Sequence, residues 1–280
     1  MDLSATFGTD TPLIGMVHLP PLPGAPGFSG SRDDLRARAL QNALTHVDGG
    51  MDGILVENFG DAPYHPDDVP KHTVAELTAT ARELAIAIDQ PLGVNVLRND
   101  AIAALSAAAA AGGDFVRVNV HSGARVTDQG IVEGRAHDTL RLREEIDADV
   151  AVLADVAVKH SAPLTGRSPD AVGDRDLDAV VADTIERGLA DGLVVSGPAT
   201  GETTDLDHLA TVLDARDDVD PDVPVLVGSG VTPETVADLL ELADGAIVGT
   251  TLKVDGETRN PVDPERVAAL VDIASAVGTD

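Results

Sequence analysis

Short apolar runs rich in β-branched residues alternate with amphipathic stretches from one end of the chain to the other. The apolar runs are nearly continuous in hydrophobicity, as is typical of parallel strands that are covered on both faces. The pattern therefore predicts eight strands, over residues 13–18, 53–58, 92–96, 115–119, 150–156, 192–197, 223–230 and 245–249.

Helical patterns fill most of the gaps between these runs. The predicted helices cover residues 33–48, 73–88, 100–111, 137–146, 176–189, 206–216, 233–242 and 265–276. Ser31, Thr232 and Asp263 precede three of them and are interpreted as N-caps. A side-chain oxygen at this position accepts a hydrogen bond from a backbone amide of the first helical turn.

Eight strand–helix units in a chain of 280 residues predict a (β/α)8 TIM barrel, an α/β fold that typically needs about 250 residues. No linker or change of composition divides the chain, so we predict one barrel domain over residues 1–280. The alternative is a doubly wound open sheet. That fold is expected to carry a glycine-rich turn after its first strand, where this chain has the proline-rich "LPPLPGAPG".

The chain has a net charge of −29, which excludes a general affinity for nucleic acid or anionic membranes. The acidic residues are dispersed over helical stretches, whereas an acidic disordered region concentrates charge and lacks apolar periodicity. We interpret the acidity as adaptation to a salty cytoplasm, because molar salt shortens the Debye length to about 3 Å. The sequence shows neither a signal peptide nor an apolar run long enough for a membrane helix, so we expect a cytoplasmic protein without membrane insertion.

The chain contains no cysteine, which excludes disulfides, thiolate metal sites and a cysteine nucleophile. His18, His121 and His160 could converge with acidic side chains, but they show no paired metal-ligand spacing. A histidine alone is more often a hydrogen-bonded structural residue. No cofactor is therefore predicted; a divalent metal stays an open alternative that the sequence does not support.

Polar residues gather at the downstream ends of the predicted strands, while the turns at the opposite ends are bland. In a TIM barrel the downstream ends carry the active site. A single buried polar side chain is readily explained by a hydrogen bond to backbone, but a polar group at nearly every strand end indicates a site. The candidates are His18, Glu57, Asn58, Asn95, Arg117, Asn119, Asp155, Lys159, His160 and Ser196.

Glu57 and Asp155 come from different strands and are the natural acid/base pair. The alternative is a buried ion-pair network of these carboxylates with Arg117 and Lys159. Lys159 is one of only three lysines in the chain. It is interpreted as a catalytic residue, either as a point charge on the substrate or as a Schiff-base nucleophile, with structural ion pairing as the alternative. The remaining candidates are predicted to bind substrate: His18, Asn58, Asn95, Arg117, Asn119, His160 and Ser196.

Two glycine-containing turns follow the last two strands. Glycines let the backbone approach an anion closely, and free amides there can donate to its oxygens. The turns are therefore predicted to bind a phosphate, with Lys253 nearby, whereas the alternative is that they are tight turns alone. Their residues are Gly228, Ser229 and Gly230 in the first turn, and Gly249, Thr250 and Thr251 in the second.

Three of the five aromatic residues, Phe28, Phe59 and Tyr64, lie in the long loops after the first two strands. They are predicted either to plug the barrel mouth or to pack against a second subunit. We therefore expect a homo-oligomer.

Long motifs of the chain resemble the BtpA family, which includes SgcQ-like proteins. The motifs include "GMVHLPPLPGAPG", "ENFGDAPY", "GVNVLRNDA", "FVRVNVHSGARVTDQGIVEG", "LADVAVKHS", "VLVGSG" and "AIVGTTLKVDG". The resemblance implies a phosphate-binding type of TIM barrel, and the acidity resembles a haloarchaeal member. Cyanobacterial members are linked to photosystem I biogenesis and others occur among sugar-metabolism genes, so the resemblance fixes no reaction and supplies no catalytic residues. The family often has a basic residue near Pro20 and Pro21; this chain has none, which puts shared specificity in doubt.

The sequence leads to two hypotheses about function. In the first, the protein is an enzyme acting on a sugar phosphate or ribosyl phosphate by acid/base catalysis, as an isomerase, epimerase or lyase. In the second, it is a non-catalytic assembly factor that binds a protein partner through the barrel rim. An assembly factor needs an exposed apolar patch, for which the loops after the first two strands are the candidates.

Overall fold

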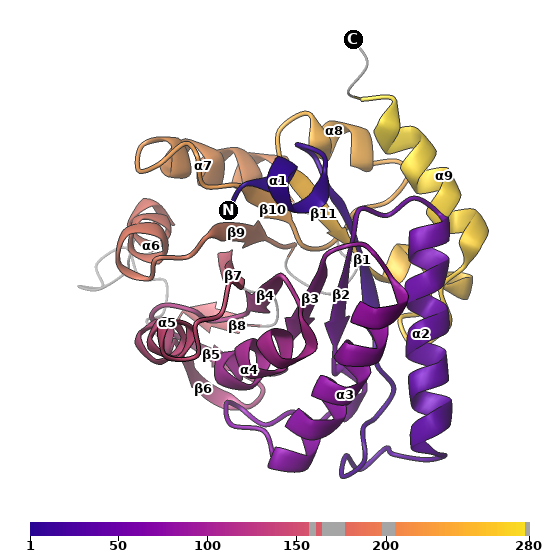
Figure 1. Cartoon of the computed structure of the whole chain (residues 1–280). Helices are drawn as coiled ribbons and strands as arrows, with labels where there is room; N and C mark the ends of the chain where they lie inside the picture. Colours follow the sequence, from indigo (N-terminus) through magenta and orange to yellow (C-terminus); the bar gives the residue numbers. More distant parts are fainter. Residues whose placement is uncertain (157–160, 164–176, 198–204, 278–280) are drawn as a thin grey trace.

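The computed structural model describes residues 1–156, 161–163, 177–197 and 205–277. Parallel strands close into a barrel in the order β1-β2-β3-β4-β7-β9-β10-β11, with helices around the outside (Figure 1). This confirms the predicted TIM barrel. The barrel strands are β1 (Leu13–His18), β2 (Gly53–Glu57), β3 (Leu92–Asn95), β4 (Phe115–Val118), β7 (Ala151–Val156), β9 (Gly192–Val195), β10 (Val225–Val227) and β11 (Gly245–Val248).

The register of the strands brings several polar residues to one level of the barrel. His18 pairs with Glu57, Glu57 with Asn95, and Asn95 with Arg117 along four neighbouring strands. Residues paired in this way point to the same side of the sheet, because side chains alternate between its two faces. A shared register therefore explains how groups distant in sequence meet at the downstream end of the barrel.

Most helices match the predicted intervals to within two residues, and they cover the outer face of the barrel (Figure 1). The predicted helix over 233–242 is shorter, at Val236–Leu240, and the one over 176–189 is an α-helix over Leu177–Ala182 that continues as a π-helix over Asp183–Arg187. Ser31 Oγ accepts a hydrogen bond from the Asp34 amide at 3.0 Å, and Asp263 caps the last helix, as predicted. The Thr232 cap is wrong, since the helix begins at Val236, after Thr235. The helices are α2 (Arg32–Asp48), α3 (Lys71–Ala87), α4 (Ala101–Ala111), α5 (Ala136–Glu145), α6 (Leu177–Ala182), α7 (Leu206–Asp217), α8 (Val236–Leu240) and α9 (Pro264–Ser275).

The core has two layers because neighbouring residues of one strand face opposite ways. In β2, Val56 belongs to the cluster between strands and helices, together with Leu77 of α3. The preceding residue, Leu55, belongs to the cluster inside the barrel, which also contains Phe115. Burial on both faces is the reason why these strands read as continuous apolar runs.

A short N-terminal helix, α1 (Leu3–Phe7), joins the interior cluster of the barrel. Its Phe7 ring meets Phe115 edge to face, with ring centroids 5.7 Å apart. Gly53 makes room for this contact, since a Cβ on it would lie 2.7 Å from the Phe7 ring. The helix therefore fills the upstream end of the barrel, opposite the polar strand ends.

A small antiparallel sheet stands beside the barrel and has the strand order β6-β5-β8. Its strands are β5 (Ala124–Thr127), β6 (Gly130–Glu133) and β8 (Ser161–Pro163). It is built from the segments that follow β4 and β7, and it lies near α5 in Figure 1. No strand is predicted from the sequence over residues 124–133 or 161–163. Among the helices described here, none has the length and apolar character that a transmembrane span requires.

Candidate active site

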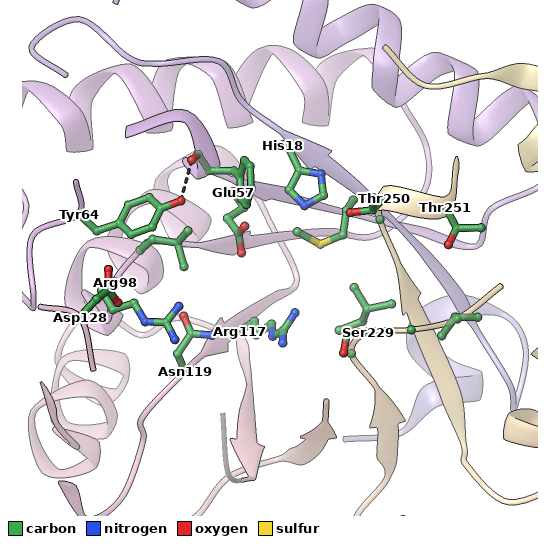
Figure 2. A pocket seen from close by; sticks show the side chains of 18 residues that line it. His18, Glu57, Tyr64, Arg98, Arg117, Asn119, Asp128, Ser229, Thr250 and Thr251 are labelled. Carbon is green, nitrogen blue, oxygen red and sulfur yellow. Dashed lines mark hydrogen bonds between the residues drawn. The ribbon is translucent and has the colours of Figure 1, made fainter. Parts of the chain in front are cut away.

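A cavity of about 400 Å³ opens at the downstream ends of the barrel strands. This volume lies within the range of small-molecule sites. Met16 and Ile247, which belong to the apolar interior of the barrel, also line it. It brings together ten of the predicted site residues (Figure 2): His18, Glu57, Arg117, Asn119, Gly228, Ser229, Gly230, Gly249, Thr250 and Thr251.

Four of the other predicted residues are described and are not part of the cavity wall. Asn58, Asn95, Asp155 and Ser196 are buried but do not line the cavity. Lys159 and His160 lie outside the described residues.

A buried ion pair supports one wall of the cavity. Arg117 Nε donates to Asp155 Oδ1 at 2.8 Å and its Nη2 donates to Oδ2 at 3.2 Å; the two side chains are 2 % and 0 % exposed. Arg117 Nη2 also donates to Ser196 Oγ at 3.2 Å. Burial alone lowers the pKa of the Arg117 guanidinium, but the negative charges of Asp155 and Glu57 outweigh it and raise the pKa above its ordinary value. Arg117 therefore stays charged at the cavity.

Asp155 also holds a second side chain of the wall. Asn119 Nδ2 donates to Asp155 Oδ2 at 2.8 Å, so both carboxylate oxygens of Asp155 accept hydrogen bonds from β4 and the residue after it. Asp155 thus fixes Arg117 and Asn119 in place.

Glu57 is the carboxylate at a barrel-strand end that lines the cavity. It is 7 % exposed, and its Oε2 accepts a hydrogen bond of 2.7 Å from Asn95 Nδ2. Asn95 is buried beside it on the neighbouring strand and fixes the orientation of the carboxylate. The next residue, Asn58, turns to the backbone instead: its Oδ1 accepts from the Leu97 amide at 2.7 Å.

The two glycine turns form the part of the cavity wall opposite β4. Gly230 has φ +71°, a left-handed conformation that favours glycine. A Cβ on Gly228 would lie 2.4 Å from Val194 Cγ1 and 3.0 Å from Arg117 Nη2, so only glycine fits there. Four backbone amides of these turns donate to no acceptor within the described part of the chain. They are the amides of Gly230, Val231, Thr250 and Thr251.

The BtpA family model matches residues 9–276. The chain belongs to the BtpA family. It is 43 % identical over 272 residues to the photosystem I biogenesis protein BtpA of Synechocystis, covering 97 % of this chain and 91 % of that protein. It is 47 % identical over 263 residues to an uncharacterised protein of Thermococcus kodakarensis, covering 94 % and 95 %.

The solved structure of N-(5'-phosphoribosyl)anthranilate isomerase from Pyrococcus furiosus has a similar fold. Its TM-score to this chain is 0.55, at 13 % sequence identity, with 95 % of this chain and 100 % of that chain covered. At this level of identity the likeness concerns the barrel fold alone.

The cavity of this BtpA-family chain also contains polar residues that are not among the candidates predicted from the sequence. Arg98, at 6 % exposure, and Asp128, in the turn between β5 and β6, lie on the left of Figure 2, beside Tyr64. Tyr64 OH donates to the Phe59 carbonyl at 2.7 Å, and burial followed by the charge of Glu57 raises the pKa of its phenol. Arg98 lies just beyond the third predicted strand and could have been found by reading a few residues further.

Phe59 and Tyr64 line the cavity, as expected of aromatic residues that plug the mouth. The His18 ring meets Phe59 edge to face, with centroids 5.0 Å apart. His121 lies elsewhere, because its Nε2 is 2.8 Å from the Gly188 carbonyl oxygen and it does not line the cavity. Among the described residues, no three metal-ligating side chains form a group that could hold an ion.

Lys253 does not line the cavity, so the expectation that it helps to bind the anion is wrong. It is 0 % exposed, and its Nζ donates to the Met16 carbonyl at 3.1 Å. The His46 ring bonds the same carbonyl oxygen through Nε2, also at 3.1 Å. Burial, followed by the charge of Arg38, lowers the pKa of Lys253 to about 7, and burial together with Lys253 lowers that of His46 to about 3.

The free energy of unfolding is expected to rise with pH between pH 7 and about pH 10 because of Lys253. Above its pKa of about 7 the folded chain has released this proton, whereas the unfolded lysine, with a pKa of about 10.4, still binds it. The slope from this one group is at most about 1.4 kcal/mol per pH unit. Chemical denaturation at several pH values measures it, with Lys253→Met as the comparison. An equal slope in Lys253→Met would contradict the assignment.

Proposed function

We propose that this BtpA-family chain is an enzyme that acts on a phosphorylated small metabolite, such as a sugar phosphate or ribosyl phosphate. The observation that carries the proposal is that one cavity joins two turns with unused backbone amides to a fixed carboxylate and a buried cation. The amides belong to the turns after β10 and β11, the carboxylate is Glu57, and the cation is Arg117.

The phosphate is bound by the glycine turns. Gly230 and Val231 contribute amides from one turn, and Thr250 and Thr251 contribute them from the other. Neutral amide dipoles and nearby cations favour a bound anion even in a chain whose net charge is −29. The Ser229 hydroxyl supports the first turn, because it accepts a hydrogen bond from the Gly197 amide at 2.8 Å.

Glu57 moves the proton in this proposal. Asn95 donates to its Oε2 and holds the carboxylate in the cavity wall, where Glu57 acts as the base toward a C–H or O–H group of the substrate. Arg117 stabilises the negative charge that develops on the substrate oxygen when the proton leaves. Asp155 acts as a positioning residue, because its two oxygens hold Arg117 and Asn119. Isomerisation, epimerisation and lysis all begin with this kind of proton transfer.

The name of the Synechocystis relative favours the second hypothesis, a biogenesis factor. For this chain that role would use the rim of the barrel. The exposed pair Val126 and Ile131, at 41 % and 57 % exposure on paired strands of the small sheet, is an apolar feature suited to a protein partner. A cytoplasmic location, a homo-oligomeric state and adaptation to salt remain predictions for either role.

Thermal unfolding in molar salt, in the presence of a panel of phosphorylated sugars, tests the enzymatic proposal. We expect at least one phosphosugar to raise the melting temperature, because a ligand that binds only the folded state stabilises it by mass action. The matched unphosphorylated sugar should have no such effect. Two results together would contradict the enzymatic proposal and support the biogenesis factor. In the first, no phosphosugar of the panel raises the melting temperature. In the second, a partner protein binds the wild-type chain but not the Val126→Asp, Ile131→Asp double variant.

A further inference from the structure

Asn119 carries a buried acceptor that no described residue uses. Its side chain lines the cavity and the residue is 3 % exposed. Nδ2 donates to Asp155 Oδ2 at 2.8 Å, whereas Oδ1 is buried and accepts no hydrogen bond within the described part of the chain. Buried polar atoms are nearly always paired, so such an atom at a cavity indicates a missing ligand group.

The orientation of the Asn119 amide follows from its surroundings. The carboxylate of Asp155 is ion-paired with Arg117 and offers only acceptors, so the NH2 group of Asn119 must face it. The reverse orientation would place two oxygens against each other. Oδ1 is therefore held on the side away from Asp155, and the Asn119 side chain lies in the cavity wall near Arg98 (Figure 2).

The position of Asn119 relates this acceptor to the proposed phosphate site. Asn119 follows β4, which lies four strands from β11 in the barrel order and thus on the opposite wall. A ligand that reaches both Thr250 and Asn119 must cross the mouth of the barrel. On its way it passes the polar groups of Glu57 and Arg117, which suit a hydroxylated chain better than an alkyl chain.

We infer that the substrate carries a hydroxyl group that donates to Asn119 Oδ1, and hence that it is a polyol or sugar phosphate rather than a phosphate ester with an apolar tail. This inference rests on the proposed function, since it assumes that the glycine turns hold the phosphate. Asn119 is then a specificity-determining residue. Without a substrate hydroxyl, its oxygen would stay buried and unpaired in the complex, which is unfavourable.

Isothermal titration calorimetry in molar salt tests whether Asn119 recognises a substrate hydroxyl. The dissociation constants of three matched pairs of probes and of inorganic phosphate are measured. The pairs are glycerol 3-phosphate with propyl phosphate, erythritol 4-phosphate with butyl phosphate, and ribose 5-phosphate with pentyl phosphate. In at least one pair we expect the hydroxylated probe to bind the wild-type protein at least tenfold more tightly. Asn119→Ala should remove most of that advantage while changing the affinity for inorganic phosphate less than twofold.

Gln41→Ala is the matched control, because it removes an exposed amide side chain on α2 and should leave every affinity unchanged. Equal binding within all three pairs by the wild-type protein would overturn the inference without requiring any variant to fold. An undiminished advantage in Asn119→Ala would also overturn it. If no probe binds, inorganic phosphate included, the proposed function fails and this inference fails with it.

Discussion

Replacing Asp155 with alanine is expected to lower the free energy of unfolding by about 3–5 kcal/mol, because it leaves a buried guanidinium without its partner. Arg117 is 2 % exposed and donates two hydrogen bonds to this carboxylate, and Asn119 donates a third. Because the Arg117 side chain is 2 % exposed and Asn119 is 3 % exposed, water can replace only little of this hydrogen bonding after the change. Chemical denaturation of the wild-type protein and of Asp155→Ala measures the difference.

Two controls separate this effect from the loss of a carboxylate as such. Asp68→Ala breaks an exposed ion pair, in which the Arg135 side chain is 36 % exposed and the Asp68 side chain 75 %. This change should lower the free energy of unfolding by less than about 1 kcal/mol. The double variant Arg117→Met, Asp155→Leu removes both charges and should recover much of the stability. If Asp155→Ala cost no more than Asp68→Ala, the pair would not stabilise the cavity wall as described.

Glu57→Gln is expected to reduce kcat by about 10²–10⁴-fold, because the amide cannot accept the substrate proton. The variant keeps an oxygen that can accept the hydrogen bond from Asn95, so fold and ligand affinity should change little. The substrate is the phosphosugar with the largest thermal shift, and the measurement compares kcat with the dissociation constant of that ligand. A fall in kcat with an unchanged dissociation constant is the signature of a group that acts in the chemical step.

Glu83→Gln is the matched control for Glu57→Gln. Glu83 lies on the surface of α3, with its side chain 46 % exposed, and contacts Arg36. It should leave kcat unchanged. Turnover by Glu57→Gln within about threefold of the wild-type rate would assign the proton transfer to another group.

The barrel could be predicted from sequence because each strand is buried on both faces, which leaves a strong apolar signal. The small elements left weaker signals. The helix α1 has five residues, too few for a helical period, although its Phe7 fills the upstream end of the barrel. In the β5–β6 hairpin, Val126 and Ile131 are exposed and pair across a short turn, so no run of buried residues marks it.

The gathering of many of these polar residues around one cavity was also predictable, because polar residues at strand ends share one register in a parallel barrel. Which of them face the cavity was not. Asp155 ends a strand as Glu57 does, yet its oxygens are taken up by Arg117 and Asn119. Lys253 follows a glycine turn, yet it bonds to the Met16 carbonyl. Side-chain pairing across strands decides these roles, and residue spacing along one chain does not record it.

The most direct test of the account is the position of the phosphate group. A crystal structure of Glu57→Gln soaked with the phosphosugar of largest thermal shift would reveal it. We predict that the phosphate oxygens lie within hydrogen-bond distance of the amides of Gly230 and Thr250, with the sugar between Glu57 and Asn119. A phosphate bound away from both glycine turns, or a sugar that does not enter this cavity, would contradict the account.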